Sequence, residues 1–370
     1  MQVIDRSGLD ALIRVLGNQG YTVVGPVVRD GAIVYDTVTG IDDLPVGWTD
    51  EQEAGTYRVR RRGDDAVFGF VVGPHSWKRY LFPARQRLFR ARQTDQGMEV
   101  EAEPSPAERY AFLGVRSCEL AAMGIQDRVF GGGPYTDSAY AERRRNSLVI
   151  AVNCAEAHGT CFCASMGTGP RARDGYDLAL TEIRLGERHG FTVEVGSEAG
   201  ETVLRELDAR EADTAEQRES EAVSQRTEAQ MGRHLDTTEL PRRLMENLEH
   251  PRWDDVADRC LGCANCTMVC PTCFCSTVED VSDLTGTEAE RVRHWDSCFN
   301  QAFSYVAGGS VRTSTRARYR QWLTHKLATW HDQFGSSGCV GCGRCITWCP
   351  VGIDITEEAR VIASDDGESN

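Results

Sequence analysis

Two stretches of the chain carry cysteines at the same unusual spacing. In each, four cysteines follow the pattern C-x2-C-x2-C-x3-C, and a proline comes directly after the fourth. The two sets are Cys260, Cys263, Cys266 and Cys270, and Cys339, Cys342, Cys345 and Cys349. This is the spacing of bacterial ferredoxins with two [4Fe–4S] clusters, where three close thiolates bind one cluster and the fourth cysteine binds the other. We therefore expect two such clusters, whose chemistry is the transfer of single electrons.

The ferredoxin pattern predicts a crossed assignment of the ligands. Cluster 1 is then held by Cys260, Cys263, Cys266 and Cys349, and cluster 2 by Cys339, Cys342, Cys345 and Cys270. Gly262, Gly341 and Gly343 permit the tight loops in which backbone N–H groups turn toward the sulfur atoms. Structural zinc is the alternative, but zinc favours two separated C-x2-C pairs. The spacing therefore favours clusters over zinc.

Four further cysteines lie in the first half of the chain, and they form a candidate third set. They are Cys118, Cys154, Cys161 and Cys163, the last two within the sequence TCFC. Cys118 and Cys154 each follow an apolar run that reads as a buried strand, and the loops after strands are frequent positions for binding sites. A third [4Fe–4S] cluster, a zinc site and metal-free thiols are the alternatives. We expect the cluster, and call it cluster 3.

The three remaining cysteines are one short of a full ligand set. Cys273 and Cys275 lie in a second TCFC sequence directly after Cys270, and Cys298 follows later. A fourth ligand would have to come from His294 or Asp296. We expect instead that these thiols pack beside a cluster without binding it.

Sequence motifs for nucleotide binding and for hydrolysis are missing. No G-x-G-x-x-G follows a predicted strand, and neither a Walker loop nor H-E-x-x-H occurs. We therefore expect no flavin or NAD(P) on this chain and no catalytic residue of its own. His158 lies near the upstream TCFC, and we interpret it as a solvent-facing loop residue.

Composition limits the partners that the chain can have. Its formal net charge of −15 argues against nucleic acid and anionic lipid as partners. Neither a signal peptide nor a membrane span is predicted, and fifteen cysteines favour a reducing compartment, so we expect a cytoplasmic protein. The arginines at 312, 316, 318 and 320 are interpreted as either solvated or part of a docking face for a partner.

The predicted elements give an α+β fold in three parts. Residues 1–197 read as a mixed α/β domain, with a hairpin over 21–38, strands over Ala66–Val72, Tyr110–Val115 and Ser147–Val152, and a second hairpin over 178–196. Residues 198–250 read as an acidic connector, either a solvated helix or partly disordered. Residues 251–370 read as a helical ferredoxin-type domain, with one helix spanning Trp322 to Trp330.

Residues around the cysteines resemble a known family. The stretches VNCAE, TCFCASMGTGP, LEHPRWDDVADRCLGCANCTMVCPTCFC, RHWDSCF and CVGCGRCITWCP together resemble the beta subunits of soluble nickel–iron hydrogenases, also called sulfhydrogenases. They equally resemble the iron–sulfur electron-transfer subunits of anaerobic sulfite reductases. The similarity runs from about Arg116 onward. One departure is AGGS at 307–310, where the family has a histidine after the glycines.

The resemblance implies a role in electron transfer. In both families the subunit links a flavin subunit that takes NAD(P)H to a catalytic subunit, which is a nickel–iron hydrogenase or a sirohaem sulfite reductase. We expect the hydrogenase link, with the sulfite reductase link as the alternative. A cluster-bearing regulatory or scaffold protein is a third hypothesis, from a different class of function.

Overall fold

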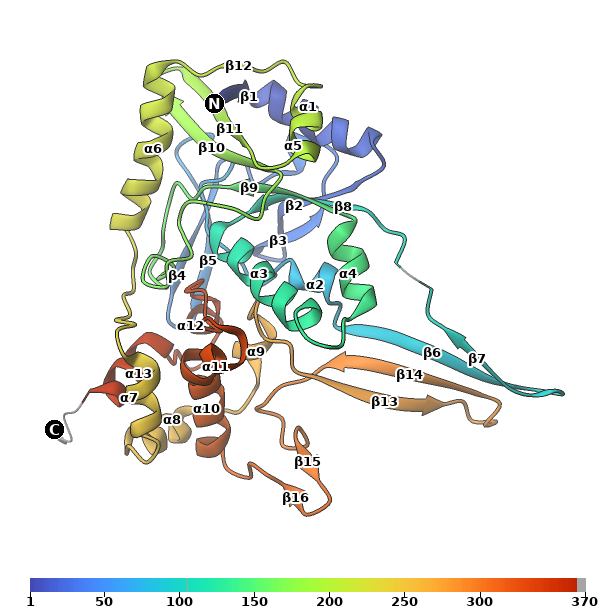
Figure 1. Ribbon diagram of the computed structural model, residues 1–370. Helices are drawn as coiled ribbons and strands as arrows, with labels where there is room; N and C mark the ends of the chain where they lie inside the picture. The colour runs from blue at the N-terminus through green and yellow to red at the C-terminus, as the bar shows by residue number, and fades with distance from the viewer. Residues whose placement is uncertain (105, 365–370) are drawn as a thin grey trace.

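An eight-stranded mixed sheet forms the larger part of the protein (Figure 1). The computed structural model describes residues 1–104 and 106–364. The strand order is β12-β1-β11-β10-β9-β8-β2-β3, and the four strands β10, β9, β8 and β2 run parallel. The bounds are β1 (Gln2–Asp5), β2 (Thr22–Arg29), β3 (Ala32–Thr37), β8 (Tyr110–Val115), β9 (Ser147–Val152), β10 (Leu178–Leu185), β11 (Arg188–Val195) and β12 (Arg210–Glu211).

Both faces of this sheet are buried, because helices cover each of them. Along β9, Leu148 and Ile150 face one hydrophobic core, whereas Val149 and Ala151 face the other. This alternation follows from the two-residue period of a strand. Helices α1 (Arg6–Asn18) and α5 (Glu198–Leu204) cover the first face. Helices α2 (Lys78–Leu81), α3 (Ser117–Gly131) and α4 (Ser138–Arg145) cover the second.

Most of the predicted strands in this sheet are confirmed. The hairpins become β2–β3 and β10–β11, and the two buried runs become β8 and β9. The strand predicted over Ala66–Val72 is wrong, because this buried segment has no strand partner among the described residues. Its N–H groups at Val67 and Phe68 donate to the carboxylate of Glu182, at 2.7 and 2.8 Å, and Arg116 donates to carbonyl oxygens of the same segment.

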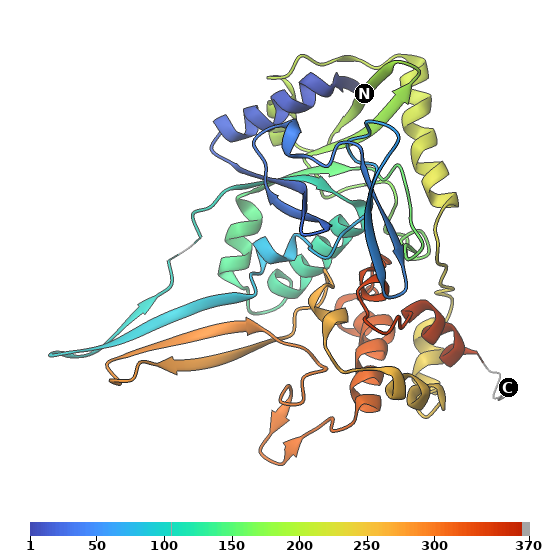
Figure 2. The same ribbon diagram turned by 180° about the vertical axis from the view of Figure 1, so that it is seen from behind.

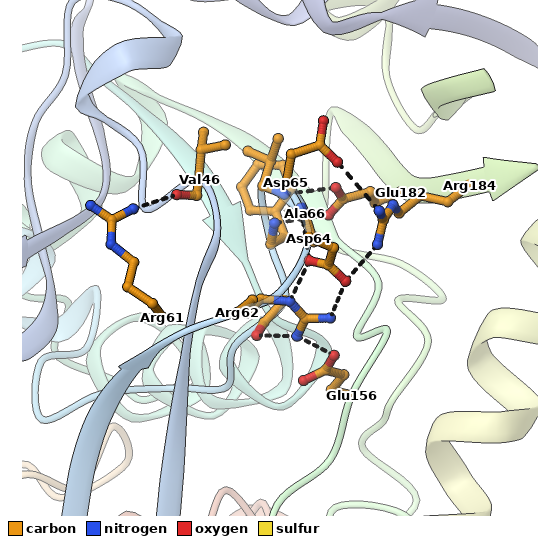
Figure 3. Close-up of polar contacts among 12 residues, drawn as sticks. Val46, Arg61, Arg62, Asp64, Asp65, Ala66, Glu156, Glu182 and Arg184 are labelled. Carbon is orange, nitrogen blue, oxygen red and sulfur yellow. Dashed lines mark hydrogen bonds and ion pairs between the residues drawn. The ribbon is translucent and has the colours of Figure 1, made fainter. Parts of the chain in front are cut away.

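A network of charged side chains fixes the beginning of this irregular segment (Figure 3). Arg62 donates to the carboxylate of Asp64 at 2.7 Å and also pairs with Glu156 from the loop after β9. Arg184 of β10 donates to the second oxygen of Asp64 at 2.6 Å. These ion pairs hold the pKa of the Asp64 carboxyl well below its usual value, with the Arg62 hydrogen bond as the main cause.

A second, four-stranded sheet projects from the body of the protein, as both views show (Figures 1 and 2). It pairs β6 (Arg85–Thr94) and β7 (Gly97–Ala102) with β13 (Ser276–Ser282) and β14 (Glu288–Trp295), in the order β13-β14-β6-β7. The last third, interpreted as helical from its sequence, therefore also contains the strands β13 and β14. Polar residues dominate β13 and β14, so their hydrophobic pattern gives no strand signal.

Short helices form the C-terminal part, around a core that includes Trp253, Tyr319 and Trp322. They are α7 (Leu240–Glu246), α8 (Arg252–Arg259), α9 (Asn265–Met268), α10 (Thr315–Thr324), the π-helical turn η2 (His325–Thr329), α11 (Trp330–Phe334), α12 (Arg344–Thr347) and α13 (Ile355–Ala363). The predicted helix from Trp322 to Trp330 is confirmed as the run from α10 through η2 into α11. The α+β class with a C-terminal cysteine-rich domain is confirmed.

The acidic segment is largely helical and packs against the large sheet. It contains α5, β12 and the helix α6 (Thr214–Ala229), which descends along one side toward the C-terminal helices (Figure 1). The boundaries predicted at 197 and 250 stay a prediction. The remaining short elements are η1 (Ile41–Asp43), β4 (Trp48–Glu53), β5 (Thr56–Arg61), β15 (Tyr305–Val306) and β16 (Gly309–Ser310). Across the described residues, no helix combines the length and apolar character needed to cross a membrane.

Candidate metal centres

The loops of the two ferredoxin motifs have the same backbone conformation. Gly262 and Gly341 hold corresponding positions and have φ values of 62° and 64°. Each loop then enters a single helical turn, α9 or α12. The N–H of Gly262 points to the sulfur of Cys260 at 3.4 Å, and the N–H of Gly341 points to that of Cys339 at 3.5 Å. Backbone donors of this kind stabilise negatively charged sulfur and help to set the potential of a bound cluster.

Cys349 lies with the first motif, although it belongs to the second in sequence. One cavity is lined by all four cysteines of the cluster 1 site, namely Cys260, Cys263, Cys266 and Cys349, with Cys345 beside them. The N–H of Ile353 donates to the sulfur of Cys349 at 3.3 Å. Phe299, Tyr319 and Trp322 form an aromatic wall, while Leu261 at the rim is 67% exposed. The cluster 1 site is therefore the one nearer to the surface.

Cys270 lies with the second motif in the same crossed manner. The electrostatic neighbours of Cys339, Cys342 and Cys345 all include Cys270. Both Cys270 and Cys339 are buried. A hydrogen bond with Cys273, together with the charge of Lys326, holds the pKa of the Cys270 thiol well below its ordinary value. The arrangement agrees with the cluster 2 site expected from the spacing, and the ligand assignment stays a prediction.

The upstream cysteines meet where α3 begins beneath the large sheet. Cys118 lies in the first turn of α3, Cys154 follows β9, and Cys161 and Cys163 lie in the loop beyond it. Cys163 interacts electrostatically with Cys154 and Cys161, and Cys118 interacts with Cys163. Burial raises the pKa of the Cys161 thiol to about 12. The four thiols therefore lie near one another, and a cluster 3 site made from them stays a prediction.

The upstream TCFC loop packs directly on the second ferredoxin motif, a contact that no sequence pattern indicates. The N–H of Phe162 donates to the carbonyl of Gly341 at 3.0 Å. A Cβ atom on Gly341 would lie 2.6 Å from the Cα of Cys163, so only glycine permits this approach. Cys342 in turn is an electrostatic neighbour of Cys118, Cys161 and Cys163. The cluster 3 site therefore borders the cluster 2 site.

The three downstream cysteines fall into two contacts. Cys273 lies beside Cys270, and Cys275 lies beside Cys298. The two candidates for a fourth ligand, His294 and Asp296, have other partners. His294 faces Glu279, with 3.7 Å between Nε2 and a carboxylate oxygen. The carboxylate of Asp296 accepts hydrogen bonds from Ser297 and Asn300. The expectation that these thiols pack beside a cluster site without binding it stays a prediction.

One smaller expectation, on His158, needs correction, and the arginines near position 316 gain partners. His158 is not solvent-facing, because its side chain is only 14% exposed and lies 3.3 Å from the carboxylate of Asp50. Burial opposes its protonation, but Asp50 and Glu156 outweigh that effect and raise the pKa of His158 to about 9. Arg316 and Arg320 pair with Glu249 of the same chain, at 2.9 and 2.8 Å. Their interpretation as either solvated or part of a docking face stays a prediction.

The donor atoms at all three sites are cysteine sulfurs, which suit iron–sulfur clusters. Cysteine sulfurs in loops whose N–H groups point at sulfur fit a [4Fe–4S] cluster at the first two sites. Within residues 1–104 and 106–364, no three His, Cys, Asp or Glu side chains converge closely enough to hold a single metal ion.

Comparison with known proteins agrees with this geometry. Residues 259–353 match the family model described as a 4Fe-4S dicluster domain. The chain is 30% identical over 344 residues to Sulfhydrogenase 2 subunit beta of Pyrococcus furiosus, which covers 91% of this chain and 92% of that protein. No solved structure matches the chain. The expected iron–sulfur character and the resemblance to sulfhydrogenase beta subunits are confirmed, and the chain belongs to the family of the sulfhydrogenase beta subunits.

Proposed function

We propose that the chain is the electron-transfer subunit of a nickel–iron hydrogenase complex. It relays electrons between a flavin subunit that takes NAD(P)H and the catalytic subunit. The observation that supports the proposal is the succession of cysteine groups: Cys349 lines one cavity with the cysteines of the first motif, and the upstream TCFC loop packs on the second motif. When bound at these sites, [4Fe–4S] clusters accept and release one electron at a time.

The protein contributes burial, positioning and access to this relay. Cysteines 118, 161, 163, 270 and 339 are buried, which excludes water from the interior sites. At the other end, Cys263 is exposed, and the side chains of Leu261 and Val351 form an apolar rim around it. An exposed end with an apolar rim is suited to a protein partner that covers it during electron transfer. The cluster 1 site is therefore proposed as the point where electrons enter or leave.

The proposed partners follow from the family. The relative's name identifies that protein as one of the subunits of a sulfhydrogenase, and we carry this assembly over to the present chain. The flavin and nucleotide are assigned to another subunit, because no phosphate-binding glycine motif occurs in this sequence.

Anaerobic purification of the tagged chain from its own cells tests the proposal. We expect a nickel-containing subunit and a flavin subunit to copurify, and NADH or NADPH to bleach the visible absorption of the clusters in that complex. A sirohaem subunit in their place would establish the sulfite reductase link, and a partner without either cofactor would favour the regulatory hypothesis.

The isolated chain provides the control. Dithionite should bleach its absorption, whereas NADH and NADPH should leave it unchanged. A flavin that remains bound to the isolated chain in stoichiometric amount through gel filtration would contradict the proposal.

A further inference from the structure

The chain contains only two lysines, Lys78 and Lys326, and both are buried at the cluster 2 site. All other basic residues among its 41 lysines and arginines are arginine. Lys78 is 4% exposed and Lys326 is 3% exposed. Lysine is seldom fully buried unless its charge is compensated. The chain thus has arginine at every other basic position, whereas its two lysines both lie in the interior, at the cluster 2 site.

The ammonium group of Lys326 contacts a predicted ligand of cluster 2. Its Nζ lies 3.3 Å from the sulfur of Cys270, 3.0 Å from the hydroxyl of Thr272 and 3.2 Å from the carbonyl of Gly338. These three contacts use all three of its hydrogen atoms. The carbonyl of Lys326 also accepts from the N–H of Gly338, so the residue is tied to the loop that leads into the second motif.

Lys78 approaches the same place from the N-terminal domain. It comes from α2, and its Nζ donates to the carbonyl of Cys273 at 3.1 Å. The ammonium also lies 3.9 Å from the ring centroid of Trp295, at the end of β14. Its charge acts on Cys273 and Cys270. Two cations from different domains therefore converge on one pair of neighbouring thiols.

No carboxylate compensates either cation within the part of the chain that the structure describes. Neither ammonium has an Asp or Glu oxygen of these residues within 4.0 Å, the limit for an ion pair. Arg344, which interacts with Cys342, differs in this respect because it pairs with buried Glu119 at 2.5 Å. The negative charge that balances the lysines must therefore come from cysteine thiolates and from what they hold.

The cluster 1 site lacks a comparable buried cation among the described residues. The charge of Arg318 acts on Cys260, but its side chain is only half-buried and donates to the carbonyls of Arg312 and Thr313. The two ferredoxin sites thus share a backbone conformation but differ in charge. The difference lies in side chains outside the cysteine motifs.

We infer that Lys326, supported by Lys78, raises the reduction potential of cluster 2 above that of cluster 1. Reduction adds a negative charge to the site, and a buried cation at about 3 Å from a ligand sulfur stabilises that charge strongly, because little water screens it. A lysine ammonium also donates an additional hydrogen bond to sulfur. The first electron then resides at the interior site rather than at the exposed one. This inference rests on the proposed electron-transfer function.

An EPR-monitored redox titration of the full chain tests it. The variant Lys326→Met removes the charge while keeping a side chain of similar length. At a fixed potential, we expect the ratio of reduced to oxidised cluster 2 to fall about tenfold, which is about 59 mV for one electron. Cluster 1 should keep its potential. Lys326→Arg, which retains the charge, should restore most of the shift, and Lys78→Met should give a smaller shift in the same direction.

The variant Cys263→Ser, which alters a predicted ligand of cluster 1 alone, assigns the two signals. An unchanged potential of cluster 2 in Lys326→Met, or an equal shift of both clusters, would overturn the inference. Loss of cluster 2 from both Lys326 variants would also overturn it, because the lysine would then be a structural requirement of the site. A wild-type chain without two [4Fe–4S] clusters would instead refute the proposed function.

Discussion

At the scale of single residues, Cys349 distinguishes the crossed assignment from an uncrossed one. It shares a cavity with Cys260, Cys263 and Cys266, which lie far earlier in the chain. We therefore predict that Cys349→Ser damages cluster 1, because serine replaces one of its four sulfur ligands. EPR spectra of the reduced protein should show an altered or missing cluster 1 signal, with the cluster 2 signal retained.

Cys270→Ser is the matched control for this prediction, since Cys270 is expected to bind cluster 2. The two variants should damage opposite signals, each identified against single changes within the two cysteine triplets. Damage to cluster 2 by Cys349→Ser would mean that each motif binds its own cluster with all four cysteines.

The two TCFC sequences give a second prediction at this scale. Upstream, Cys161 lies in a group of four thiols of which three are buried, whereas downstream Cys275 lies beside Cys298. We predict about twelve irons per chain in three clusters. Cys161→Ser should then remove about four irons, whereas Cys275→Ser should remove none. Iron analysis of anaerobically prepared protein measures both values.

The reverse pattern would exchange the roles of the two sequences. If Cys275→Ser costs four irons and Cys161→Ser costs none, the third cluster belongs downstream. A total of about eight irons in the wild type would leave only the two ferredoxin sites occupied.

Spacing in the sequence could predict the cysteine sets but not the residues that surround them. The positions of Cys260 to Cys270 are local, so their geometry follows from a loop of eleven residues. Lys326 approaches Cys270 across 56 positions, and no local pattern indicates such a contact. The one signal available in the sequence was the scarcity of lysine. In a chain that uses arginine at all its other basic positions, two retained lysines indicate a specific role.

At the scale of elements, the contact between the upstream TCFC loop and the second motif gives a third prediction. Gly262 and Gly341 have nearly the same positive φ, so alanine introduces the same backbone strain at both, about 1 kcal/mol. Only at Gly341 would the added Cβ meet another segment, the backbone of Cys163 at 2.6 Å. Gly341→Ala should therefore displace the loop and lower both the melting temperature and the iron content.

Gly262→Ala is its matched control, because no heavy atom outside its own neighbourhood lies within 4 Å of the new Cβ among the described residues. It should keep the wild-type iron content and lose little stability. Equal effects of the two variants in thermal unfolding and iron analysis would show that backbone strain, not the loop contact, determines the outcome.

Among the elements, those with a regular hydrophobic pattern were predictable. Buried runs such as Tyr110–Val115 and Ser147–Val152 lie in the middle of the sheet, and their apolar residues show it directly. Ala66–Val72 has an equally apolar sequence, but the Glu182 carboxylate takes the place of a neighbouring strand. A side chain more than a hundred positions away thus determines the conformation of this segment, and the local sequence pattern does not indicate such a contact.

At the scale of the whole molecule, the projecting sheet could not be predicted as a unit. Its two hairpins are separated by more than 170 residues, and they pair through the β6–β14 ladder, which also carries long-range ion pairs such as Arg92 with Glu288 at 2.9 Å. β13 and β14 alternate charged residues with few large apolar ones. The acidic connector, residues 198–250, packs on the eight-stranded sheet. The chain therefore returns to a sheet whose first strands lie near its N-terminus.

The pairing of β6 with β14 also has a consequence for synthesis of the chain. While the ribosome is making the middle of the protein, β6 has been formed but its partner has not. One edge of the early hairpin therefore stays unpaired until residues up to Trp295 have emerged, and an unpaired edge is prone to join other chains. The four arginines of β6, at positions 85, 87, 90 and 92, repel a second copy of the same strand during that interval. We therefore expect the residues that later form ion pairs with β14 to protect the nascent chain from aggregation.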